Sequence, residues 1–73
     1  MKGTCKWFDP KKRYGFLTYQ EGGKDKDVFV HRSELSGEGF KTLVEGEEVT
    51  FDIEPGVSGL IRAVRVRRAY DIP

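Results

Sequence analysis

Turn signals built from glycine and proline divide this chain into runs too short for a long helix. They lie at Asp9-Pro10, 21–23, 37–39, Glu45-Gly46 and 55–59. Between them, apolar and polar residues alternate at the two-residue period of strands, which we predict near 2–9, 13–20, 27–32, 47–54 and 60–68. Five short strands with one long link over 33–46 predict an all-β fold whose sheet closes into a small barrel. Closure also removes exposed strand edges, which a small protein must protect.

The length of 73 residues allows one small domain, which we place at 1–68, followed by a short C-terminal tail at 69–73. A single helical turn is expected at 33–35, and Leu35, Leu43 and Val44 are expected to plug one end of the barrel. In the last two strands the residues predicted to face inward are Val49, Phe51, Ile53, Val64 and Val66.

The single cysteine, Cys5, excludes an intramolecular disulfide, and no cluster of ligand residues indicates a metal site. We interpret Cys5 as a small buried hydrophobe, which fits a reducing, cytoplasmic setting. The N-terminal residues lack the apolar region of a signal peptide. The longest apolar run is three residues, far below what a membrane-spanning helix needs. We therefore expect no cofactor and no membrane partner.

Aromatic side chains fall on the predicted strands at positions that face away from the core. Tyr14 and Phe16 share one face of their strand, opposite Leu17 and Tyr19. In the next strand, Phe29 and His31 share a face, because the β-branched residues at 28 and 30 take the core side. Trp7 and Phe8 are adjacent, so we place Phe8 in the core and Trp7 outside, through a bulge.

Cations flank these rings in the sequence. They are Lys6, Lys11, Lys12, Arg13 and Arg32. The net charge is only +1, but residues 1–32 carry +4, residues 33–54 carry −6 and residues 55–73 carry +3. Exposed rings on which bases stack, bordered by cations that hold phosphates, are typical of a single-stranded nucleic-acid interface. The basic part of the chain coincides with the aromatic part, which favours a polarised surface.

Three blocks of the sequence resemble the bacterial cold-shock protein family. They are Lys6-Trp7-Phe8, residues 12–17 and residues 27–31, the last two resembling that family's two ribonucleoprotein motifs. Residues 37–43 and 45–51 resemble later segments, so the similarity runs from about residue 2 to residue 66 in matching order and spacing. The resemblance implies a five-stranded antiparallel barrel of the oligonucleotide-binding (OB) fold. It also implies binding of single-stranded RNA and DNA and an RNA-chaperone role.

The resemblance also implies roles for individual residues. Lys6 and Lys12 would contact the strand backbone, and Asp27 would hydrogen-bond a base edge. The base-stacking residues would be Trp7, Tyr14, Phe16, Phe29, His31 and Phe40.

The chain departs from the family pattern at several positions. Asp9 stands where the family usually has Asn, Arg13 where it usually has Gly, and Arg32 where many relatives place a ring. The last strand, 60–68, is arginine-rich, which indicates a stronger reliance on charge. We hypothesise that Arg32 contacts a phosphate, with partial stacking as a secondary contribution.

Two classes of function remain open from the residues. The first is a single-stranded nucleic-acid binder of broad specificity, with a modest preference for pyrimidine-rich strands. The second is a protein-interaction module that grips a peptide with its exposed rings; the interleaved cations favour the first. An enzyme is not indicated, since no paired carboxylates, nucleophile set or phosphate-binding loop appears. We expect a monomer, with a weak or domain-swapped dimer as the alternative.

Overall fold

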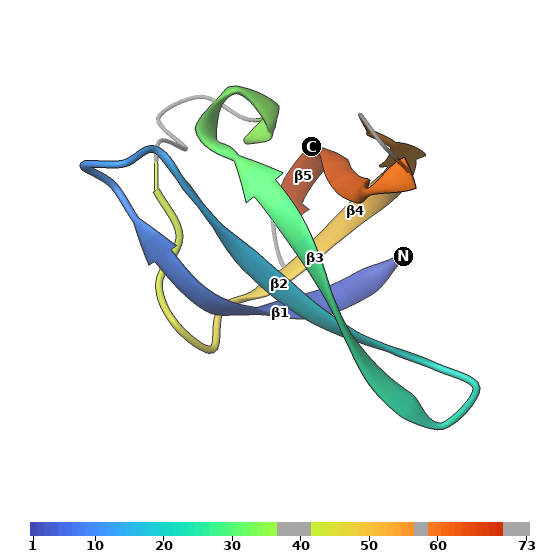
Figure 1. The fold of residues 1–73 in the computed structure, drawn as a ribbon. Coiled ribbons are helices and arrows are strands. Elements are labelled where there is room, and N and C mark those ends of the chain that lie inside the picture. The colour runs from blue at the N-terminus through green and yellow to red at the C-terminus, as the bar shows by residue number, and fades with distance from the viewer. Residues whose placement is uncertain (37–41, 57–58, 70–73) are drawn as a thin grey trace.

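The computed structural model describes residues 1–36, 42–56 and 59–69, and its five strands curl around one core (Figure 1). Strands β1 (Lys2–Asp9), β2 (Tyr14–Glu21) and β3 (Lys24–His31) are followed by a 3-10 turn, η1 (Arg32–Glu34). Strands β4 (Glu48–Pro55) and β5 (Ile61–Arg68) complete the sheet. The five predicted strands are present, and η1 lies one residue before the predicted helical turn.

The strands form a closed barrel in the order β1-β2-β3-β5-β4. The pairs β1–β2, β2–β3, β1–β4 and β4–β5 are antiparallel, whereas β3 and β5 pair in parallel at Phe29–Arg62 and Val30–Ala63. This all-β, five-stranded barrel confirms the predicted fold class. One point differs from a fully antiparallel barrel: the β3–β5 pair is parallel. Strand directions cannot alternate all the way around a ring with an odd number of strands, so a closed five-stranded barrel needs a parallel pair.

The core contains the apolar residues that the two-residue period assigns to the inner face. Leu17, Val28, Val30, Val49 and Val66 are fully buried. Leu43 is buried and Leu35 packs against the core, as predicted for one end of the barrel. The prediction that Val44 joins them is wrong, because Val44 is 67% exposed. Its backbone N–H instead donates to Glu47 Oε1 at 3.2 Å in a turn, which directs the side chain outward.

The β2–β3 hairpin extends beyond the barrel (Figure 1). Gly22 and Gly23 both have positive φ, 62° and 78°, which is the geometry of a tight hairpin turn whose twist matches its strands. Pairing therefore continues to Glu21–Lys24, and β3 begins at Lys24 rather than at residue 27 as predicted.

A bulge in β1 places the first aromatic residue on the outer surface. Cys5 pairs with Leu17 and Trp7 pairs with Phe16, so Lys6 is the extra residue between them. Lys6 and Trp7 therefore both face outward, while Cys5 is buried and Phe8 packs against the core. This arrangement confirms the predicted division between Trp7 and Phe8.

Gly15 allows β1 and β2 to approach closely beneath the aromatic residues. A Cβ atom at Gly15 would collide with the carbonyl oxygen of Trp7 and would lie 2.7 Å from the Cα of Phe8. Only glycine fits this position without moving one strand away from the other.

No helix within residues 1–36, 42–56 and 59–69 is long and apolar enough to cross a bilayer.

Candidate nucleic-acid interface

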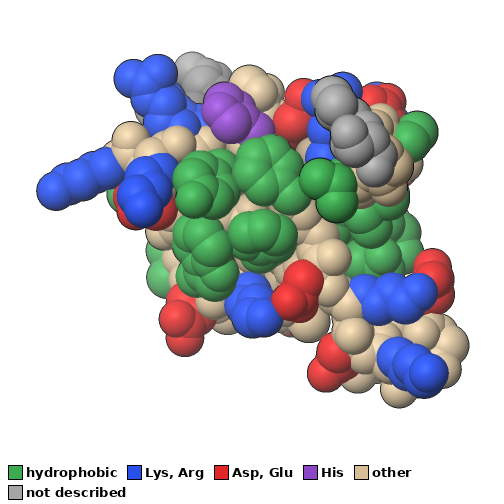
Figure 2. Space-filling model, in the orientation of Figure 1, with side chains coloured by type: hydrophobic (Ala, Val, Ile, Leu, Met, Phe, Trp, Pro, Cys, Tyr) green, Lys and Arg blue, Asp and Glu red, His purple; other side chains and the backbone are tan. Residues whose placement is uncertain are grey.

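Four aromatic side chains form a contiguous cluster on the outer face of β1, β2 and β3. Trp7 lies 5.6 Å from Tyr14 and 5.4 Å from Phe16, and Phe29 lies 5.6 Å from Tyr14 and 6.0 Å from Phe16, between ring centroids. Each ring of this set, hereafter the ring cluster, thus contacts two others. Figure 2 shows the apolar patch over these strands, with the histidine at one end and basic side chains beside it.

The ring cluster faces solvent because the core residues occupy the other side of the same strands. Trp7 is 38% exposed, and the other three rings are partly exposed. The sheet register aligns Phe16 with both Trp7 and Phe29, so the three strands present one continuous surface. Flat, partly exposed rings of this kind can accept stacked bases.

His31 extends this surface at the end of β3, in register with Tyr14. Its Nδ1 accepts a hydrogen bond from the backbone N–H of Ser33 at 3.1 Å and lies 2.9 Å from the Ser33 hydroxyl. The ring thereby caps η1 and is held in one orientation. Because Nδ1 is an acceptor, the neutral ring carries its proton on Nε2, which is left to donate to a ligand.

The turn between β1 and β2 presents the cations at this same end of the cluster. Asp9 Oδ1 accepts hydrogen bonds from the backbone N–H groups of Lys11 at 2.9 Å and Lys12 at 3.2 Å. The Asp9 carboxylate therefore organises the turn. Arg13 has φ 67°, and its carbonyl accepts from the backbone N–H of Arg32 at 2.9 Å, which joins the turn to the end of β3.

Lys6 was predicted to contact the backbone of the ligand strand, and Asp27 a base edge. In the structure the two side chains contact each other, at the edge of the ring cluster opposite the turn. Lys6 Nζ lies 2.7 Å from Asp27 Oδ2, and the hydroxyl of Thr18 donates to Asp27 Oδ1 at 3.2 Å. The hydrogen bond from Lys6 holds the pKa of Asp27 below its ordinary value. In the free protein each of these two side chains, predicted to contact the ligand, thus already has a partner within the protein.

The structure adds a neighbouring groove that the sequence did not reveal. It has a volume of about 510 Å³ and is lined by Phe16, Asp27, Phe29, Gly56, Leu60, Ile61 and Arg62. Leu60 is 72% exposed and Ile61 is 40% exposed. In the sequence, the only indication of this groove was that two apolar residues, Leu60 and Ile61, directly follow a turn. Their position beside Phe29 depends on the parallel β3–β5 pair.

The arginines of β5 are mostly neutralised by acids of β4 and its preceding turn. Arg65 lies 2.8 Å from Asp52 and 3.6 Å from Glu54, and Arg62 lies 3.5 Å from Glu54. Arg62 and Arg65 therefore already have acidic partners in the free protein, and the stronger reliance on charge that the sequence indicates stays a prediction.

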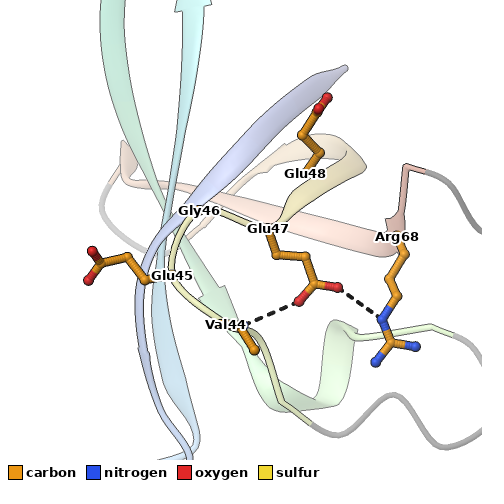
Figure 3. Close-up of a pocket in the computed structure, with 6 residues that line it drawn as sticks. All are labelled: Val44, Glu45, Gly46, Glu47, Glu48 and Arg68. Carbon is orange, nitrogen blue, oxygen red and sulfur yellow. Dashed lines mark hydrogen bonds and ion pairs between the residues drawn. The ribbon is translucent and has the colours of Figure 1, made fainter.

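Arg68, at the end of β5, is also paired. In the shallow pocket of Figure 3, Glu47 bridges the backbone N–H of Val44 and the Nε of Arg68, the latter at 2.9 Å. Glu45 and Glu48 line the same pocket, and Glu48 also pairs with Lys2 at 3.1 Å.

Phe40, predicted to stack a base, lies outside the described residues. No group of three or more His, Cys, Asp or Glu side chains suited to a metal ion occurs in the part of the chain that the structure describes.

Comparison with known proteins gives a consistent match. The 'Cold-shock' DNA-binding domain family matches residues 1–69. A cold shock-like protein of Thermotoga maritima is 58% identical over 59 residues, which cover 81% of this chain and 85% of the relative. Cold shock-like protein CspA of Shewanella violacea is 55% identical over 58 residues, 80% of each chain. Glycine-rich protein 2 of Nicotiana sylvestris is 49% identical over 65 residues, 89% of this chain but only 29% of that longer protein.

Proposed function

This chain belongs to the 'cold-shock' DNA-binding domain family, and on that premise we propose that it binds single-stranded RNA and DNA by stacking bases on its ring cluster. The family is a nucleic-acid-binding one rather than an enzyme family. We further propose an RNA-chaperone role, in which the protein holds transcripts in an unfolded state.

The observation that carries the proposal is the closed set of ring contacts among Trp7, Tyr14, Phe16 and Phe29 on a solvent-facing sheet. Base–aromatic stacking contributes about 1–3 kcal/mol per base and accepts any base, because every base has a π-face. Bases stacked on the protein cannot stack on one another in a duplex, which disfavours pairing of the strand with itself. Chaperone activity without strong sequence preference follows from that physical mechanism.

The proposal includes a modest preference for pyrimidine-rich strands, since such preferences arise from stacking strength and backbone flexibility. We expect a monomer that binds one strand segment within the roughly 4–16 nucleotides typical of a single OB barrel. A cytoplasmic setting fits this role, because the one cysteine of the sequence, Cys5, is free and buried.

Titration of the protein with a pyrimidine-rich oligonucleotide, followed by Trp7 fluorescence, tests the proposal. A base stacked on the partly exposed indole should quench its emission, and the single strand should bind far better than a duplex of the same sequence. Equal affinity for the duplex, or no quenching at saturation, would contradict stacking on the ring cluster. A peptide-binding module would bind neither ligand.

A further inference from the structure

The cations of the described residues divide into two groups by whether an acidic side chain lies within ion-pair distance, 4.0 Å. Paired cations are Lys2, Lys6, Lys26, Arg62, Arg65 and Arg68. In the same described ranges, no acid pairs with Lys11, Lys12, Arg13 or Arg32, which we call the turn cations. Lys24 and Arg67 are also unpaired there, but each stands alone on another element.

Backbone hydrogen bonds gather the turn cations at one end of the ring cluster. The Arg32 N–H donates to the Arg13 carbonyl at 2.9 Å, and the Arg13 N–H donates to the Asp9 carbonyl at 2.8 Å. Arg13 directly precedes Tyr14 and Arg32 directly follows His31, and Tyr14 and His31 are partners in the β2–β3 register. The uncompensated charge thus begins where the aromatic surface ends.

The backbone of Arg13 provides an independent observation. Its φ of 67° lies in the left-handed region, which glycine adopts freely and other residues adopt at a cost. The side chain is exposed and forms no ion pair within the described residues that would offset this cost. Residues held in such conformations concentrate at functional sites.

We propose that the turn cations bind the phosphodiester backbone of a strand beyond its last stacked base, so that the site extends past the ring cluster at its Tyr14–His31 end. The inference rests on the proposed function and deepens it. Arg13 and Arg32 offer planar guanidinium groups that match phosphate oxygens in pairs, while Lys11 and Lys12 add point charges. This part of the site recognises phosphate without reading bases.

The experiment separates bases from phosphates in the ligand. Three probes are compared by titration: a thymidine hexamer, the hexamer with four abasic nucleotides at its 5′ end, and the hexamer with the same extension at its 3′ end. At about 50 mM salt, one extension should tighten binding several-fold, and each phosphate contact it adds should steepen the plot of log affinity against log salt by about 0.7. The same extension with neutral methylphosphonate linkages should give no gain.

Two single variants, their double variant and a control locate the effect. The ratio of extended to unextended affinity should fall in Arg13→Gly and in Arg32→Gln, and should fall further in the double variant, in which only Lys11 and Lys12 of the turn cations remain. Lys24→Gln is the matched control, because Lys24 is an unpaired, exposed cation on the β2–β3 hairpin; it should leave the ratio unchanged. Arg13→Gly suits the left-handed backbone, so loss of folding does not confuse the result.

The outcomes distinguish the inference from the function on which it rests. If the hexamer binds but neither abasic extension tightens binding, the inference is wrong and the proposed function stands. If an extension tightens binding equally in wild type and the double variant, the phosphates lie elsewhere and the inference is also wrong. Failure of the hexamer itself to bind would overturn both.

Discussion

Arg13 has a backbone conformation that costs stability, while its exposed side chain adds a charge to the surface. A left-handed conformation places the Cβ of a non-glycine residue close to the neighbouring carbonyl oxygen, at a cost of roughly 1–2 kcal/mol. Glycine avoids that contact but loses more conformational freedom on folding, by about 0.5–1 kcal/mol. The difference between these effects favours glycine slightly at φ 67°.

Arg13→Gly should therefore stabilise the fold by up to about 1 kcal/mol, which corresponds to a rise in Tm of about 4–8 °C for a domain of this size. Thermal and chemical denaturation measure the change. Lys12→Gly is the control: Lys12 is in the same turn but is not among the positive-φ residues, so glycine should destabilise there. If Arg13→Gly lowers stability as much as Lys12→Gly does, the strain at Arg13 is wrongly assigned.

Asp27→Asn tests the ion pair with Lys6. The amide retains the acceptor for Thr18 but removes the negative charge 2.7 Å from Lys6, which leaves the full charge of Lys6 available to a phosphate. The slope of log affinity against log salt should steepen by up to about 0.7. Asp25→Asn, in the same strand and hydrogen-bonded to Gln20, should leave the slope unchanged. An unaltered slope in both variants would show that Lys6 does not contact the strand backbone.

At the scale of the elements, each strand near the site packs one face in the core, which stabilises the fold, and presents the other face to the proposed ligand. In β2, Leu17 and Tyr19 are buried while Tyr14 and Phe16 are partly exposed. β4 contributes Phe51 to the core, where its ring contacts Tyr19 at 5.9 Å between centroids. Substitutions on the two faces should consequently affect different properties.

Phe16→Ala should weaken binding of a single strand by about 1–3 kcal/mol, the usual loss of one stacked base. Phe51→Ala should instead destabilise the fold by about 3–5 kcal/mol, because it leaves a cavity in the core. Denaturation curves and titrations of both variants measure the two effects side by side. Equal destabilisation by Phe16→Ala and Phe51→Ala would reverse the assignment of the faces.

Gly15→Ala should destabilise the β1–β2 pair. The added methyl group would collide with the backbone of Trp7 and Phe8, which cannot move as a flexible side chain can. We expect a loss of about 1–3 kcal/mol, typical of overpacking, together with a changed Trp7 emission. Gly22→Ala is the comparison, since a Cβ there meets nothing within 4 Å and only the positive φ opposes it. A loss no larger than that of Gly22→Ala would contradict the close approach.

At the scale of the whole molecule, the pairing of β4 with β5 decides which arginines have acidic partners. Acids on β4 and its preceding turn lie next to the arginines of β5, so charge is compensated on that side. Within the described ranges no acidic side chain pairs with the turn cations, because Asp9 of the same turn accepts from backbone N–H groups instead. The unpaired basic surface is therefore narrower than the count of arginines indicates.

Global stability should decline at alkaline pH because of Cys5. Burial, followed by the charges of Glu47 and Glu45, raises the pKa of the Cys5 thiol to about 11. An unfolded thiol ionises near pH 8.5. The stability that the protonated Cys5 thiol contributes is thus fully present below about pH 8.5. It is lost as the pH rises toward 11, because the unfolded state releases the thiol proton first. Denaturation between pH 8 and 11 measures the decline.

Cys5→Ala is the control for this pH dependence, since alanine fits the buried site but cannot ionise. Its stability should be lower at pH 8 but should fall less steeply above pH 8.5. Native Cys5 should also react slowly with iodoacetamide and quickly in denaturant, because burial and a raised pKa both suppress the thiolate. Parallel declines in the two proteins would assign the alkaline loss to other groups.

The sequence by itself determined which side chains face the core and which face the solvent around the site. A strand alternates its faces with a strict two-residue period, so the positions of Val28 and Val30 predict the outward direction of Phe29 and His31. The turn signals, the adjacent Trp7 and Phe8, and the number of strands likewise predicted the barrel and its bulge from local information alone.

Only the tertiary structure decided which charges are free and where the aromatic surface continues. The partners of Lys6 and Arg65, and the groove at Arg62, depend on the register between paired strands. The left-handed backbone of Arg13 likewise follows from the Asp9 turn and its hydrogen bond to Arg32. Local periodicity determines the direction of a side chain, but its charge is neutralised or left free by whichever strand the closed barrel places beside it.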